Sequence, residues 1–440
     1  MKKTRVLVPV LMAVILTASW VSFVMGTLNE MSTNNDYLKK AQESVENRLY
    51  EQAIEYYKES LKHDLSEETY VMIQQTYGLL YGEEHTAFFR KCYITDMAEA
   101  ASRFPGNELF WQKQVELYME EGNKSRAFEV LKAAMRAEVE SEKLNAEYKE
   151  LAYSVRTDYR SYGAFKTALN GYITVFDGSG WLVMDNEGEL LTGQYPFIGL
   201  INDNGQGIYT NSIDTRLLDS NQVTRARFDI EVEDAGCYDA AEDLVPVKQN
   251  GTWRYMNTKG EFLPGSFDVA GSFYKGQAVA CSNDEWMLLD SVGNQKKLNG
   301  IQDVKLDLHG FYIQNGIIIA KENGKYGFYD SEFNRIGSFH ADDMDLYLSD
   351  KGIAFKQNGK WGFADAEGNI LVQPAYTDAK SFSNGYAAVC NEEGLWGFLN
   401  SRYELVIDHA YVDAHYFTKA ETCMVSNSEG MVQMLEFVFD

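Results

Sequence analysis

Cysteine is scarce in this 440-residue chain, and its five copies are widely separated. None forms a CxxC motif, and none has a histidine at metal-ligand spacing. An odd, scattered set also makes no disulfide framework. Two of them, Cys281 and Cys390, stand at equivalent places in two β-repeats described below. We therefore expect these two cysteines to be small, buried strand residues.

Recognisable catalytic motifs are missing as well. The sequence has no P-loop, no GxSxG, no HExxH and no Rossmann glycine pattern. His409 and His415 stand six residues apart in a strand-turn context, which is typical of surface histidines. The run from His340 to Leu346 resembles half a calcium loop, but it lacks the glycine and terminal glutamate of an EF-hand. The sequence therefore predicts no catalytic residue, no cofactor and no metal site.

Proline and basic residues are also few. Six prolines exclude long proline-rich linkers. The 40 basic residues are outnumbered by 65 acidic ones, which gives a formal net charge of −25. A surface of this charge repels nucleic acid and anionic lipid headgroups. Solubility is the simplest role of the acidity, and attraction of cationic partners is an alternative.

Long apolar runs are absent except at the N-terminus, where residues 6–26 carry no charge. A helix of about 20 apolar residues spans the hydrocarbon core of a membrane. Lys2, Lys3 and Arg5 precede the run, and the next basic residue is Lys39. Because positive flanks stay on the cytoplasmic side, the pattern predicts that the rest of the chain is extracytoplasmic.

The N-terminal pattern therefore predicts a cytoplasmic segment at 1–5, a transmembrane helix at 6–26 and a linker at 27–34. A cleaved signal peptide is the alternative. The apolar run is longer than the core of a signal peptide, and no small-x-small cleavage site is obvious near its end. These two features favour a retained anchor.

Residues 35–165 have the period of amphipathic helices, with apolar side chains three or four positions apart. Helix pairs recur, because Ala53 and Ala127 are 74 residues apart, about two periods of a helix-pair repeat. The segment between them, residues 66–104, would form a third pair, which matches the pattern poorly. The region resembles the tetratricopeptide repeat, although it lacks the family's first-helix Trp and Leu-Gly. The residues that carry the resemblance are Ala41, Ala53, Tyr57, Pro105, Ala127 and Ala134. It implies a solenoid that binds protein or peptide; a plain stalk is the alternative.

Beyond Gly171 the period changes to two and turn residues multiply, which indicates short β-strands. One strand of each unit begins with a large aromatic residue that we expect to fill the core. These residues are Trp181, Trp253, Trp286, Tyr326, Trp361 and Trp396. Thr215 takes the aromatic's place between the first two. The count is seven units, followed by a truncated echo at residues 427–439.

A glycine follows the aromatic residue in the last three units, at Gly327, Gly362 and Gly397. A glycine inside a strand allows another backbone or ring to approach closely. At the sequences Gly-Lys-Trp-Gly-Phe (359–363) and Trp-Gly-Phe (396–398) the chain resembles the WG-repeat family. The first four units lack the glycine. The family has no single activity, so the resemblance implies a binding or display module.

The sequence as a whole predicts a multidomain protein with a transmembrane helix, all-α tetratricopeptide-like helices and an all-β repeat domain at 170–440. The β-units predict a propeller of about seven blades, closed by pairing of Met431–Phe439 with Tyr172–Phe176. An open β-solenoid is the alternative.

The function that these features predict is a non-enzymatic binding or scaffold module of the bacterial cell envelope. The protein would be a single-pass membrane protein whose partner is another protein or an envelope polymer. Two alternatives stay open at this point. One is an envelope hydrolase that acts on glycan or peptide through scattered carboxylates, and the other is a ligand-free spacer.

Overall fold

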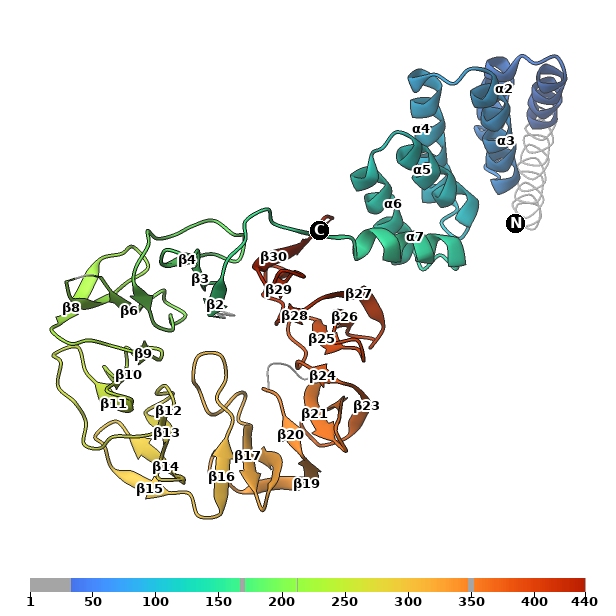
Figure 1. The fold of residues 1–440 in the computed structure, drawn as a ribbon. Coiled ribbons are helices and arrows are strands. Elements are labelled where there is room, and N and C mark those ends of the chain that lie inside the picture. Colours follow the sequence, from blue (N-terminus) through green and yellow to red (C-terminus); the bar gives the residue numbers. More distant parts are fainter. Residues whose placement is uncertain (1–32, 167–170, 212, 347–351, 440) are drawn as a thin grey trace, which may run out of the picture. The chain divides into compact units, whose positions relative to one another are not determined.

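The computed structural model describes residues 33–166, 171–211, 213–346 and 352–439 (Figure 1). The predicted cytoplasmic segment and membrane helix lie outside the described residues, as does most of the predicted linker. Within the described ranges, no helix is long and apolar enough to cross a membrane. The chain divides into two compact units, a helical unit that ends at Ala152 and a β-unit that begins at Tyr153.

The helical unit is a series of antiparallel helices in which each helix packs on the next, and α5 also packs on α7. Residues 33–46 are helical, and after them the elements follow through short turns. They are α2 (Tyr50–Leu61), α3 (Glu67–Glu83), α4 (Ala87–Arg103), α5 (Glu108–Glu120), α6 (Lys124–Arg136) and α7 (Glu142–Ala152).

The predicted helix pairs are all present, including the middle pair between residues 66 and 104. Polar residues cap the helix starts: the main-chain N–H of Thr69 donates to Ser66 Oγ and that of Phe89 to Thr86 Oγ1. The four alanines of the tetratricopeptide-like pattern are fully buried, so they allow close helix approach. The resemblance to that family itself stays a prediction. The boundary predicted at residue 165 is too late, because strands begin at Val155.

The β-unit is a propeller of eight sheets among the described residues, here called blades 1 to 8 in chain order. Blade 1 contains β2 (Ala164–Lys166), β3 (Ile173–Phe176) and β4 (Trp181–Met184), and blade 2 contains β5 (Phe197–Ile198), β6 (Gly207–Thr210), β7 (Thr215–Leu218) and β8 (Thr224–Phe228). Blade 3 contains β9 (Asp234–Ala235), β10 (Val245–Gln249) and β11 (Thr252–Met256), and blade 4 contains β12 (Val269–Ala270), β13 (Gln277–Ser282), β14 (Glu285–Asp290) and β15 (Gln295–Lys297).

Blades 5 to 8 follow the same antiparallel order. Blade 5 contains β16 (Ile301–Val304), β17 (Ile318–Glu322), β18 (Lys325–Tyr329) and β19 (Arg335–Ala341), and blade 6 contains β20 (Asp343–Met344), β21 (Ile353–Gln357), β22 (Lys360–Ala364) and β23 (Ile370–Tyr376). Blade 7 contains β24 (Asp378–Ala379), β25 (Tyr386–Cys390), β26 (Trp396–Asn400) and β27 (Leu405–Tyr411), and blade 8 contains β28 (Asp413–Ala414), β29 (Thr422–Ser426), β30 (Val432–Phe437) and β1 (Val155–Thr157).

The last blade closes the ring, because its outer strand is β1, from the start of the β-unit. Val155 pairs with Phe437 and Thr157 with Leu435. A closed ring excludes the open solenoid. The predicted closing strand is wrong, since Ile173–Phe176 is β3 and pairs inside blade 1.

The predicted number of about seven blades is also wrong. The sequence repeat is offset from the blade: it begins at the third strand of one blade and ends at the second strand of the next. The unit that starts at Trp361, for example, contributes β22 and β23 to blade 6 and β24 and β25 to blade 7. The truncated echo supplies β30, the third strand of an eighth blade that β1 completes.

The glycines after the aromatic residues lie against the backbone of the outer strand. A Cβ added to Gly362 would be 2.5 Å from the Val372 carbonyl oxygen, and one on Gly397 would be 2.6 Å from that of Ile407. Both outer strands shift register beside the glycine, so their backbone bends inward there. Neither glycine has a left-handed φ, so the requirement for glycine is steric.

We predict that Gly362→Ala and Gly397→Ala each destabilise the propeller by about 1–3 kcal/mol, the usual cost of overpacking. Thermal unfolding of the purified protein measures the change. Gly193→Ala is the matched control, because Gly193 has open space around it and no left-handed φ. Equal melting temperatures for all three variants would contradict the steric explanation.

Candidate functional site

The signature residues predicted from the sequence lie in the third strands of blades 1 to 7, at or next to the first residue of each strand. The structure places them between blades instead of on an open face. The indole N–H of Trp286, in blade 4, donates to the Gln302 carbonyl of blade 5 at 3.1 Å. The hydroxyl of Thr215 donates to the Ile230 carbonyl at 2.8 Å. These residues therefore hold the ring together.

Lysines from the inner strands lie over several of these aromatic rings. Lys305 Nζ is 4.8 Å from the centroid of the Tyr326 ring and 3.0 Å from Asp343 Oδ1 in the next blade. Lys166 Nζ is 5.2 Å from the Trp181 ring and donates to a carbonyl of blade 2. A cation held over an aromatic face and beside a carboxylate links adjacent blades.

One group of polar residues has the composition of a serine-hydrolase site. Ser272, Asp307 and His309 meet in the loops after the inner strands of blades 4 and 5. The Ser272 hydroxyl, however, donates to the main-chain carbonyl of His309 at 2.6 Å and is 1% exposed. A nucleophilic serine needs a hydrogen bond to the imidazole ring and access to substrate. This trio therefore ties two loops together.

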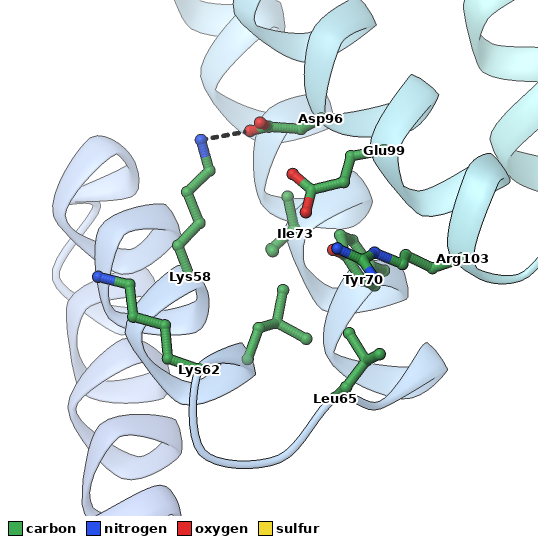
Figure 2. Close-up of a pocket in the computed structure, with 9 residues that line it drawn as sticks. Lys58, Lys62, Leu65, Tyr70, Ile73, Asp96, Glu99 and Arg103 are labelled. Atoms are coloured by element: carbon green, nitrogen blue, oxygen red, sulfur yellow. Dashed lines mark ion pairs between the residues drawn. The ribbon is translucent and has the colours of Figure 1, made fainter.

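One pocket of the described residues lies in the helical unit, between α2, α3 and α4, with a volume of about 360 Å³. Figure 2 shows side chains of α2 and α4 on opposite sides of it, with α3 between them. We call it the α2–α4 pocket. It is lined by Lys58, Leu61, Lys62, Leu65, Tyr70, Ile73, Asp96, Glu99 and Arg103.

The helical period explains why these side chains meet. Lys58, Leu61 and Lys62 are three or four positions apart and so share one face of α2. Asp96, Glu99 and Arg103 share a face of α4 for the same reason. Leucine, isoleucine and tyrosine side chains form the floor, and charged groups form the rim.

The buried acidic group of the pocket, Asp96, already has partners. Lys58 Nζ lies 2.6 Å from Asp96 Oδ2, the contact drawn in Figure 2, and the Tyr77 hydroxyl donates to the same oxygen at 2.7 Å. Burial, and then the hydrogen bond to Asp96, raise the pKa of Tyr77. Burial, and then the charge of Glu99, raise the pKa of Tyr70 to about 12, so both hydroxyls stay protonated donors at neutral pH.

The basic groups of the rim are more open. Lys62 is exposed, and within the described ranges its one ion-pair partner is Glu59, at 2.5 Å and three positions earlier in the sequence. Arg103 is exposed and forms no ion pair with another residue of the described ranges. The α2–α4 pocket thus offers an apolar floor beside cationic side chains, on a chain that is acidic overall.

Reasoning from the sequence missed this pocket. It predicted the middle helix pair, residues 66–104, only as a poor match to the repeat and assigned it no site. The sequence did contain a signal for this site. The chain is acidic overall, yet the basic residues Lys58, Lys62 and Arg103 each stand three or four positions from an apolar or acidic residue, the spacing of one helix face. That signal becomes a site only when α2 and α4 are known to flank α3. Among the described residues, no group of three His, Cys, Asp or Glu side chains is placed to hold a metal ion.

The comparisons with known proteins agree with the repeat pattern. The family model for the WG containing repeat matches residues 361–394, which confirms the resemblance at its best-matched unit. No curated protein matches the chain.

Several solved structures are similar to the propeller at low identity. BamB from Moraxella catarrhalis is 14% identical, with a TM-score of 0.40 over 65% of this chain and 94% of that one. Hsv2 from Kluyveromyces lactis is 10% identical, with a TM-score of 0.38 over 55% and 94%. The Pan2 WD40 domain of Neurospora crassa is 10% identical, with a TM-score of 0.32 over 66% and 89%. The fold assignment rests on the sheet order of the chain itself.

We predict that Lys58→Met destabilises the helical unit by about 1–3 kcal/mol, because it leaves the mostly buried Asp96 carboxylate without its cation. Adding Asp96→Asn in the same background should recover much of the loss. Lys39→Met is the control, since its pair with Glu43, at 3.8 Å, is fully exposed and should change stability by less than about 0.5 kcal/mol. Chemical denaturation followed by circular dichroism measures the three variants, and a double variant no more stable than Lys58→Met alone would contradict the pairing.

Proposed function

We propose that this chain, which carries a WG-containing repeat, is a membrane-anchored binding or scaffold protein of the bacterial cell envelope and performs no catalysis. The N-terminal charge pattern supports the anchor and the extracytoplasmic placement of both units. The repeat composition of both units supports binding, because such stacks present wide, rigid surfaces to other macromolecules.

The observation that carries the proposal is the α2–α4 pocket. It combines concave shape, an apolar floor and a small number of directed polar groups, the features that binding sites share. Its buried acid, Asp96, is neutralised by Lys58, whereas Lys62 and Arg103 are exposed at the rim. We infer a peptide segment of a partner protein as ligand, with an apolar side chain on the floor and a carboxylate near these cations.

The topology is tested by protease treatment of spheroplasts from a bacterial expression host. We predict that added protease degrades the propeller while a cytoplasmic marker protein in the same cells stays intact. Both proteins should be degraded after detergent lysis. Protection of the propeller in intact spheroplasts would overturn the extracytoplasmic placement.

The pocket is tested by a photo-crosslinking amino acid at Leu65, which lines it and is 50% exposed. In living cells this position should give a discrete crosslinked product, and Arg103→Glu should reduce its yield severalfold, because the substitution reverses the charge on the rim. Leu49 is the matched position, since it is 52% exposed, belongs to the same unit and lies outside the pocket. Equal labelling at both positions would contradict a peptide site in this pocket.

A further inference from the structure

A second groove of the helical unit lies between α5 and α7 and has a volume of about 290 Å³. We call it the α5–α7 groove. Its lining residues share faces of the two helices at spacings of three, four and seven positions. They are Val115, Glu116, Met119, Glu120, Lys143, Glu147, Glu150 and Leu151.

The base of the groove is apolar. Val115 is 1% exposed and Leu151 is 4% exposed, so both belong to the core of the unit. Met119 is 38% exposed, and its flexible thioether chain can adapt to a bound group. An aliphatic side chain placed here would therefore remove apolar surface from water on both sides.

The charges around this base are mostly negative. Four glutamates stand against one lysine. Lys113 neutralises Glu116 at 2.8 Å, and the Tyr81 hydroxyl lies 3.5 Å from Glu120. Glu150 forms no ion pair with any residue in the described part of the chain.

Glu147 is the least satisfied of the four. One carboxylate oxygen, Oε2, is covered by protein and accepts no hydrogen bond within the described ranges. Its other oxygen lies 4.0 Å from Lys143 Nζ, a long contact to an exposed side chain. Burial raises the pKa of this carboxyl, Lys143 opposes the rise, and Glu150 and Glu116 add to it. An additional cation beside Glu147 would be stabilised by two carboxylates that lack a close partner.

We propose that the α5–α7 groove binds a lysine or arginine side chain of a partner polypeptide. The aliphatic stem lies on Val115, Met119 and Leu151, and the charged head lies between Glu147 and Glu150. Charge complementarity selects this occupant, because a cationic head, unlike an acidic or neutral one, is attracted by both the half-buried Glu147 and the exposed Glu150. The inference rests on the proposed function in one respect, that the helical unit binds a partner. Its site is separate from the α2–α4 pocket.

The test uses the full chain in detergent with methyl-labelled methionine, and NMR to follow the Met119 methyl signal, assigned with Met119→Leu. The probe is the capped peptide Gly-Leu-Arg-Leu-Gly, and its comparison peptide has citrulline, a neutral arginine analogue, in place of arginine. We expect the arginine peptide to shift the Met119 signal and to bind about tenfold more tightly than the citrulline peptide.

The matched variants are Glu147→Gln combined with Glu150→Gln, and Glu142→Gln as the control. Glutamine keeps the shape of glutamate, and Glu142 is exposed on the same helix outside the groove. The double variant should weaken the arginine peptide by about tenfold, and the control should change its affinity by less than about twofold.

Three results would overturn the inference: equal binding of the two peptides, an unchanged affinity in the double variant, or no Met119 shift at about 5 mM peptide, a concentration well above a weak dissociation constant. These failures are distinguishable from a failure of the proposed function. If the Leu65 crosslink remains while the peptide does not bind, the α2–α4 pocket stands and only the α5–α7 groove falls.

Discussion

Pairing of the first strand with the last is the constraint on which the propeller depends. An open row of blades would expose two sheet faces and the unpaired edge of β30 to solvent. Instead β1 covers that edge, and Arg156 Nε donates to Glu436 Oε1 at 2.8 Å across 280 residues of sequence. Met184 of blade 1 packs in one buried cluster with Met424 and Met434 of blade 8. The two ends of the ring are thereby joined by backbone pairing and by apolar packing.

At the remaining junctions of the ring, neighbouring blades are joined because the sequence repeat is offset from the blade. Most repeats contribute two strands to one blade and two to the next, and the repeats at Trp181 and Trp253 contribute one strand to the first blade and two to the next. No blade therefore forms from a single repeat. Interactions between blades then reinforce the covalent link: Lys305 joins the Tyr326 ring to Asp343 of the following blade.

The two grooves of the helical unit differ in charge although they are built by the same packing rule. In the α2–α4 pocket the buried Asp96 is neutralised by Lys58, and Lys62 and Arg103 are exposed. In the α5–α7 groove the carboxylates of Glu147 and Glu150 lack close partners. The two proposals together imply sites that favour side chains of opposite sign, which an extended partner with charges of both signs would satisfy.

Local periodicity alone determined much of this protein. Spacings of three and four placed the helix pairs, and the aromatic frame placed the third strand of seven blades, because these patterns reflect which face of a single element is buried. The steric requirement for glycine at Gly362 and Gly397 could likewise be predicted from the sequence of a single strand. The blade number, the closing strand β1 and both grooves were decided only by tertiary structure. They depend on which distant elements come together, as Val155 does with Phe437, and no period within one element records that choice.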